Sequence, residues 1–176
     1  MTGPISVPIR GSLPCSSSTA EADPWVPLKV SWEVPRLDGA LYVNLTGTGG
    51  GLVELRVDGA SGALFELVVV DELPTVRRDL PVALPEDSGQ AAEVDRDIWE
   101  WKVTPDYREV AKRTLDRSAE LGISHHAGLT TVWLGAAEPA RLLRAAAVRV
   151  GVAASGELVC VSTPTPEVVD PGFNRL

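Results

Sequence analysis

The chain has 176 residues, of which 44% are hydrophobic and 23% charged. This composition fits one globular domain with a full hydrophobic core and excludes a chain that is disordered throughout. The formal net charge of -8 would repel a phosphate backbone, and no run of 18 apolar residues is present, so we expect neither nucleic acid nor a membrane as a partner.

Residues 1–24 contain four prolines and the polar run 16–19, a composition typical of a flexible N-terminal arm. No apolar run follows a basic start there, so we do not expect a signal peptide. Cys15 lies in this arm and Cys160 in a predicted strand, so a disulfide would tie a mobile segment to the core. We therefore predict two free thiols and a cytoplasmic protein. Arg far outnumbers Lys and Ala, Gly and Val are abundant, as is typical of a GC-rich bacterial genome.

The folded part is predicted to begin near Trp25, where apolar and polar side chains start to alternate with the period of half-buried strands. A glycine-rich turn and an Asp-Gly-Ala-Ser-Gly turn separate some of these runs, and the second of them closes the clearest hairpin. Strands are expected over residues 29–34, 41–45, 52–57 and 63–70, with the turns at 47–51 and 58–62.

Prolines and acidic residues between 71 and 90 predict a loop that crosses between two halves of the domain and holds at most one short edge strand. Alternation returns at residues 98–103, where Trp99 and Trp101 are expected to point inward. Further on, residues 141–146 fit a helical turn or a strand equally well. A strand over 129–134, a second hairpin over 148–152 and 158–162, and a C-terminal tail over 165–176 complete the prediction.

One helix is predicted, over residues 105–121. Thr104 supplies a capping hydroxyl, Pro105 suits the first helical position, and Asp106 places an acid in the first turn. Apolar residues follow at helical spacing, and Gly122 is a natural stop. The expected fold is therefore mainly β in an α+β chain, an antiparallel β-sandwich or partly open barrel of about eight strands with one helix, formed by residues 25–164.

The two hairpin turns resemble each other, because residues 57–64 and 152–158 share an Ala-Ser-Gly sequence. A duplication of residues 25–73 and 95–164 would explain the match. Independent use of the same turn chemistry also explains it, since Ser and Gly suit tight turns. The match is shorter than the periods that define repeat architectures, which favours the second interpretation.

The five tryptophans are numerous for a chain otherwise poor in aromatic residues. They would line a ligand cavity for a small apolar molecule or, as we favour, fill a core in which Phe and Tyr are scarce. The candidate ligand-binding residues are Trp25, Trp32, Trp99, Trp101 and Trp133.

A metal site is the other candidate, formed by His125 or His126 with Asp95 or Asp97. Neighbouring histidines on a strand point to opposite sides, so they rarely bind one ion together. A turn is the favoured interpretation of the histidine pair, and a solvated face that of the acidic run. The sequence contains no nucleophile motif, no paired-cysteine ligand set and no phosphate-binding loop, so we name no catalytic residue and no cofactor.

These observations favour a non-catalytic bacterial protein that acts through protein–protein interaction, as accessory or immunity-like proteins do. Its acidic surface would meet a basic partner. One alternative is a small-molecule-binding β-barrel or cyclase-like enzyme with a Trp-lined apolar pocket. The other is a metal-dependent enzyme that uses the histidine pair with the two aspartates.

Overall fold

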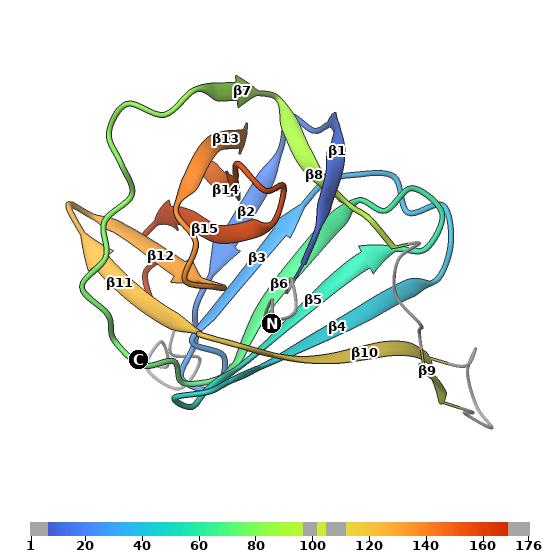
Figure 1. The fold of residues 1–176 in the computed structure, drawn as a ribbon, viewed down its shortest axis with the longest axis horizontal. Coiled ribbons are helices and arrows are strands. Elements are labelled where there is room, and N and C mark those ends of the chain that lie inside the picture. The colour runs from blue at the N-terminus through green and yellow to red at the C-terminus, as the bar shows by residue number, and fades with distance from the viewer. Residues whose placement is uncertain (1–6, 97–101, 105–111, 169–176) are drawn as a thin grey trace, which may run out of the picture.

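The computed structural model describes residues 7–96, 102–104 and 112–168, which form strands β1 to β15 and no helix (Figure 1). The molecule is therefore mainly β. Seven strands form the larger sheet in the order β2-β3-β6-β5-β4-β10-β9. They are β2 (Ser18–Glu21), β3 (Leu28–Trp32), β4 (Ala40–Gly47), β5 (Leu52–Asp58), β6 (Leu64–Asp71), β9 (Lys102–Thr104) and β10 (Lys112–Ala119).

A second sheet has six strands in the order β11-β12-β15-β14-β13-β7, and β1 pairs with β8 in a separate two-stranded ribbon. Both large sheets have two free ends in their strand order, so neither closes into a barrel. The strands of the smaller sheet are β7 (Glu86–Ser88), β11 (Gly122–His126), β12 (Leu129–Trp133), β13 (Pro139–Ala145), β14 (Val148–Ala153) and β15 (Leu158–Pro164). The ribbon consists of β1 (Ile9–Pro14) and β8 (Gln90–Val94).

One hydrophobic cluster joins the sheets and the ribbon. Most of its members come from strands. On β4 and β5 they alternate with less buried side chains, as the period-two pattern predicts, whereas β6 and β15 have runs of consecutive buried residues. The members of the cluster include Val43, Leu55 and Leu67 of the larger sheet, Val132, Val150 and Val161 of the smaller one, and Ile9 and Val94 of the ribbon. The described residues contain no helix that could span a membrane.

The connection between β6 and β7 crosses from the larger to the smaller sheet, as predicted (Figure 1). It also covers the outer edge of β11: Ile123 donates its N–H to the carbonyl of Pro74 and accepts the N–H of Val76, both at 2.9 Å. This pairing removes one exposed strand edge. The short edge strand expected in this region is β7.

Both predicted hairpins are confirmed. Gly62 in the β5–β6 turn has a φ of 79° and Gly156 in the β14–β15 turn a φ of 90°, values that favour glycine. The hairpins lie in different sheets, which decides neither for a duplication nor for the favoured independent use of the same turn chemistry. The ambiguous stretch 141–146 is largely strand β13.

The predicted helix is wrong in its described part, because residues 112–119 form β10 and pair in parallel with β4. Residues 105–111 lie outside the described residues. Leu115 and Ala119 are buried while Asp116 and Ser118 are exposed. A spacing of four residues is even, so it places side chains on one face of a strand as well as of a helix.

The flexible arm expected over residues 1–24 is also corrected in its described part, residues 7–24, because β1 and β2 lie within it. Residues 1–6 lie outside the described residues. Pro8 precedes β1 and Pro14 ends it, so neither removes a donor from the middle of a ladder. Cys15 follows directly and is buried, and neither cysteine is in a disulfide.

Candidate functional site

The described tryptophans differ in their surroundings. Trp133 is 1% exposed and lies on β12, Trp32 on β3 is also buried, and Trp25 is 74% exposed. Trp99 and Trp101 lie outside the described residues. Trp133 lines a pocket of about 300 Å³, and neither Trp25 nor Trp32 reaches it. Core packing therefore accounts for Trp32, and Trp133 is the described tryptophan placed for ligand contact.

Arg78 and Trp133 both line this pocket and contact each other. The guanidinium carbon of Arg78 lies 3.9 Å from the indole centroid, a cation–π contact. Arg78 also donates hydrogen bonds to the carbonyls of Gly135 and Ala137, at 2.7 and 2.9 Å, while the indole N–H donates to Ser124 Oγ at 2.8 Å. These hydrogen bonds fix both partners of the cation–π contact, the guanidinium and the indole. The remaining lining residues are Thr48, Gly49, Pro74, Val76, Glu120, Leu121 and Gly122.

The two histidines end β11 rather than forming the turn, which consists of Ala127 and Gly128. His125 Nδ1 lies 2.9 Å from the Thr130 hydroxyl, and His126 Nδ1 lies 3.8 Å from a carboxylate oxygen of Asp79. Each imidazole therefore has its own partner, as expected for adjacent strand residues.

Asp95 follows β8, and Asp97 lies outside the described residues. Within the described part of the chain, no group of three or more His, Cys, Asp or Glu side chains is placed to hold a metal ion. The three described members of the predicted metal site thus do not form a ligand set.

The outward face of the larger sheet carries the polar side chains of its alternating strands. Inward residues of β4 and β5 are fully buried, whereas the side chains between them are half-buried or exposed. Cross-strand register aligns the outward side chains in rows, since directly opposed residues share a face. We call this surface the acidic sheet face. Its charged and larger described members are Glu21, Lys29, Tyr42, Asn44, Glu54, Arg56, Glu66, Val68 and Asp116, and the register also brings Thr19, Ser31, Thr46, Thr114 and Ser118 to this face.

Arg56 organises the middle of the acidic sheet face. Its guanidinium lies 2.7 Å from Glu66 and 2.9 Å from Glu54, and its carbon is 5.7 Å from the centroid of the Tyr42 ring. Burial alone would lower the pKa of Arg56, but the two carboxylates raise it above its ordinary value. Among the described side chains of this face, four carboxylates stand against the two cations Lys29 and Arg56. The register of β9 and β10 places the positions of Lys102 and Lys112 on the same face.

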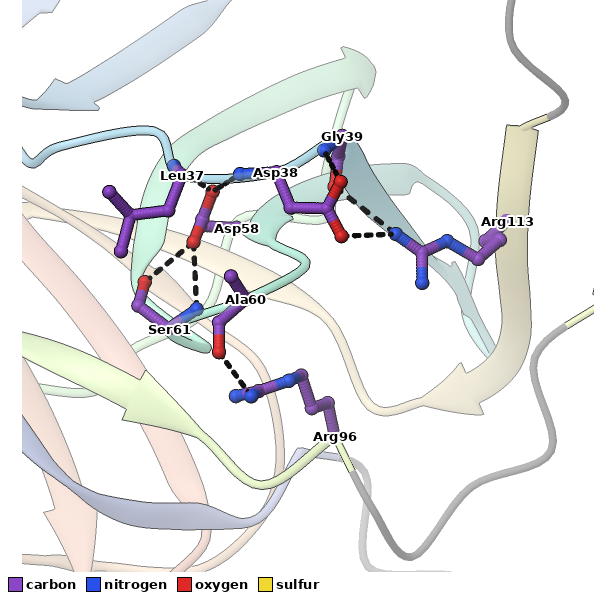
Figure 2. A network of polar contacts seen from close by, with 8 residues as sticks. All are labelled: Leu37, Asp38, Gly39, Asp58, Ala60, Ser61, Arg96 and Arg113. Atoms are coloured by element: carbon purple, nitrogen blue, oxygen red, sulfur yellow. Dashed lines mark hydrogen bonds and ion pairs between the residues drawn. The ribbon is translucent and has the colours of Figure 1, made fainter.

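Asp58, at the end of β5, ties two loops together (Figure 2). Its Oδ1 accepts the backbone N–H groups of Leu37 and Asp38, at 2.8 and 3.1 Å. Its Oδ2 accepts the N–H and the hydroxyl of Ser61, both at 2.8 Å. The side chain is fully buried, so the β3–β4 and β5–β6 loops are joined by one carboxylate.

Burial by itself raises the pKa of Asp58, but the hydrogen bonds from Ser61, Asp38 and Leu37 outweigh it and hold this pKa below its ordinary value. Two arginines brace the same loops from outside (Figure 2). Arg113 lies 3.5 Å from the Asp38 carboxylate, and Arg96 donates a hydrogen bond to the carbonyl of Ala60.

An apolar groove of about 250 Å³ lies beside these loops. We call it the Leu37 groove, after a lining residue that is 68% exposed. Its walls are the end of β1, the β3–β4 loop and the β5–β6 turn. The lining residues are Leu13, Pro14, Val34, Pro35, Leu37, Ser61 and Ala63.

Sequence reasoning missed both the groove and the role of Asp58. The Asp-Gly pair predicts a turn, but an aspartate at this position also supplies acceptors for nearby N–H groups. No local sequence pattern connects residues 13 and 14 with residue 37, and the strand β1 that contains residues 13 and 14 was not predicted. Neither the protein-family models nor the curated proteins that were compared with this chain match it.

Proposed function

We propose that this chain is a non-catalytic, accessory or immunity-like protein of β-sandwich architecture that binds a basic protein partner through the acidic sheet face. The observation that carries the proposal is the arrangement of carboxylates on this face. Glu21 and Asp116 stand on β2 and β10, with Glu54 and Glu66 on the central strands between them.

The geometry of the face suits recognition of a cationic surface. A field of one sign speeds encounter with a partner of the opposite sign and disfavours acidic competitors. Arg56 and its carboxylates fix each other, so little side-chain freedom remains to be lost when a partner binds. Tyr42 and Val68 are half-buried among the charges and offer apolar contact at the centre.

A charge-reversal pair tests the proposal. We choose the double variant Glu21→Lys/Asp116→Lys, because both side chains are exposed and lie at opposite ends of the face. The matched control is Asp79→Lys/Asp87→Lys, whose carboxylates are equally exposed and lie in and after the β6–β7 connection, so net charge changes equally. Each protein is immobilised and incubated with an extract of the source organism, and the proteins that bind to it are quantified by mass spectrometry.

The expected result is a protein of high isoelectric point that is enriched on the wild type and on the control but at least about tenfold less on the face variant. Equal enrichment on all three proteins would show that net charge alone is responsible, and the proposal would fail. Enrichment of acidic or neutral partners only would also refute it.

The pocket at Trp133 favours a second candidate, the binding of a small apolar molecule. Its volume of about 300 Å³ is at the lower end of the range for ligand sites, and Pro74, Val76 and Leu121 provide apolar walls. Titration with indole, followed by the amide signals of these walls in NMR spectra, tests it. We expect saturable shifts in the wild type. These shifts should disappear in Gly49→Trp, where the added ring would fill the pocket. If the wild type shows no shifts at these residues, the second candidate is rejected.

A further inference from the structure

We propose that the chain consists of two structural repeats, residues 9–75 and 94–168, which arose by duplication of one unit. The turn sequences alone leave this origin open, because two hairpins can acquire the same turn chemistry independently. The inference rests instead on features of the whole fold. These are the strand order, a shared bulge, the contacts of the ribbon and the segment that follows each repeat.

The two large sheets have the same strand order. Five neighbouring strands follow the order β2-β3-β6-β5-β4 in the larger sheet and β11-β12-β15-β14-β13 in the smaller one, so each strand number increases by nine. All pairings within both sets are antiparallel. Each sheet then adds a parallel strand, β10 beside β4 and β7 beside β13. Greek-key orders recur in unrelated sandwiches, so the details of the register carry more weight than the order itself.

The main hairpin of each repeat has a β-bulge at the same place. In both hairpins the last register pair before the turn is a valine with a leucine, and the strand after the turn then has one extra residue. The extra residues are Phe65 and Val159, each directly after the leucine. Antiparallel pairing does not require a bulge, and bulges are conserved within families, so the shared position favours a common origin. The register pairs are Val57–Leu64 and Arg56–Glu66 in the first repeat, and Val152–Leu158 and Gly151–Cys160 in the second.

The ribbon contacts the two turns in the same way. Ile9 of β1 donates its N–H to the carbonyl of Gly156 at 2.7 Å. Val94 of β8 donates its N–H to the carbonyl of Gly62, also at 2.7 Å. Ile9 and Val94 are themselves register partners. A two-fold relation between the repeats requires this arrangement, because it must exchange the two ribbon strands together with the two turns.

The segment after each repeat pairs with the other repeat. Thr75 lies four residues after the end of β6 and forms a parallel bridge with Ile123 of β11. Val168 lies four residues after the end of β15 and forms a parallel bridge with Ala22, which directly follows β2. β2 and β11 occupy the same end of their strand orders. Each repeat is therefore extended at its edge by the chain that leaves the other one.

The outward faces of the two repeats have diverged. The register makes Glu66 the counterpart of Cys160 and Ser31 the counterpart of Trp133. Cys160 and Trp133 are buried, and Val76 of the β6–β7 connection packs against their cluster. Glu66 and Ser31 belong to the acidic sheet face. One outward face thus packs within the chain, while its counterpart carries charged side chains. The duplication does not depend on the function proposed for that face.

Circular permutation of the complete chain tests the equivalence of the repeats. Joining residue 176 to residue 1 makes a connection from Val168 to Ile9 that should correspond to the one from Thr75 to Val94. Eight residues follow Val168 and eight precede Ile9, whereas eighteen lie between Thr75 and Val94. The two connections are thus of similar length, and we expect a direct join without a spacer to be accepted.

Two permutants share this direct join. The first begins at Val82, which is fully exposed and lies between the repeats. The control begins at Gly50, in the exposed turn of the β4–β5 hairpin inside the first repeat. In urea denaturation, the midpoint of the Val82 permutant should stay within about a fifth of the wild-type midpoint, because only the order of the repeats changes. The Gly50 permutant should have a clearly lower midpoint, since its opening interrupts a hairpin.

A third permutant begins at Val82 and has a flexible Gly-Ser spacer at the join. If only this protein folds, the two connections are not equivalent and the inference is overturned. Failure of every permutant to fold, or equal midpoints of the Val82 and Gly50 permutants, also overturns it.

The origin of the repeats is tested on the sequences of homologous chains from related organisms. Residues at equivalent positions of the two repeats should be identical about twofold more often than residues displaced by two positions. This displacement is the matched control, because it preserves the alternation of inward and outward side chains. Equal frequencies of identity in the two alignments would mean that the repeats converged, and the duplication would be rejected.

Discussion

Asp58 and Ser61 are joined by two hydrogen bonds, because one carboxylate oxygen of Asp58 accepts both the N–H and the hydroxyl of Ser61. The other oxygen accepts two N–H groups of the preceding loop. A buried carboxylate with four donors is stabilised as an anion and fixes the groups that surround it. The loops next to the Leu37 groove therefore depend on the charge of one side chain.

Asp58→Asn is expected to lower the free energy of unfolding by about 2 kcal/mol, since an amide offers one acceptor oxygen and places its NH₂ group against existing donors. Urea denaturation measures the change. Asp116→Asn is the control, because Asp116 is exposed and its carboxylate accepts a hydrogen bond from the Asn44 side chain; it should change stability by less than about 0.5 kcal/mol. Equal effects of the two substitutions on the free energy of unfolding would show that the hydrogen bonds of Asp58 to the two loops contribute no more to stability than those of an exposed aspartate.

The same carboxylate predicts a pH dependence. Its pKa is lower in the folded chain than the ordinary value of 3.8, so its stabilising effect is fully present above pH 3.8 and is lost as the pH falls through the folded pKa. The difference in unfolding free energy between wild type and Asp58→Asn should therefore be constant near neutral pH and shrink at acidic pH. Urea titrations of both proteins at a series of pH values test this. A difference that stays constant down to pH 2 would contradict the lowered pKa.

Strand alternation could be predicted from the sequence because it is a local property of neighbouring side chains. Leu41, Val43 and Leu45 of β4 alternate with polar residues, and glycines mark the turns that follow. The two main hairpins could be predicted for the same reason, since both their strands and their turns are continuous in sequence. These local signals predicted strands that match β3, β4, β5, β6, β12, β14 and β15, but the described residues form more strands than the eight or so expected.

Pairing between distant segments could not be predicted in this way. β10 is a strand because it lies beside β4, more than 60 residues away, and its four-residue apolar spacing fits both kinds of element. The pairing of β1 with β8 likewise gathers Leu13 and Pro14 to the Leu37 groove. The acidic sheet face required the cross-strand register, which only the fold provides.

Arg78→Ala should lower the free energy of unfolding by about 2 kcal/mol, because it removes the contact with Trp133 and leaves two carbonyls without donors. Arg78→Lys should recover only a part, since an ammonium cannot donate in the same planar geometry. Urea denaturation again provides the measurement. Arg77→Ala, at the adjacent and exposed position, serves as the control and should be nearly neutral. Full stability of Arg78→Lys would mean that charge alone matters at this position.

Cys160 is expected to be chemically inert in the folded protein. Burial raises the pKa of its thiol to about 12, although the Gly151 N–H and Arg78 act in the opposite direction. Since the thiolate is the reactive form, Cys15→Ser, which leaves Cys160 as the single thiol, should not react with a disulfide reagent at pH 8 until urea is added. Rapid stoichiometric reaction of the native variant would refute the burial of this thiol.

Gly151 leaves room for the sulfur of Cys160. A Cβ at position 151 would lie 2.5 Å from that sulfur and 3.1 Å from Cβ of Pro139, too close for either contact. Gly151→Ala should therefore lower the free energy of unfolding by about 2 kcal/mol. In Gly11→Ala the added methyl group meets nothing within 4 Å, so this control should be neutral or slightly stabilising.

A double variant separates the steric cause from the backbone. Cys160→Ala removes the sulfur and opens space for the new methyl group, so Gly151→Ala should be much less damaging in that background than in the wild type. The difference between the two effects is the coupling energy of the pair, obtained from urea denaturation of the four proteins. If Gly151→Ala costs the same in both backgrounds, the contact with the sulfur is not the reason for glycine at this position, and the close approach of Pro139 becomes the explanation.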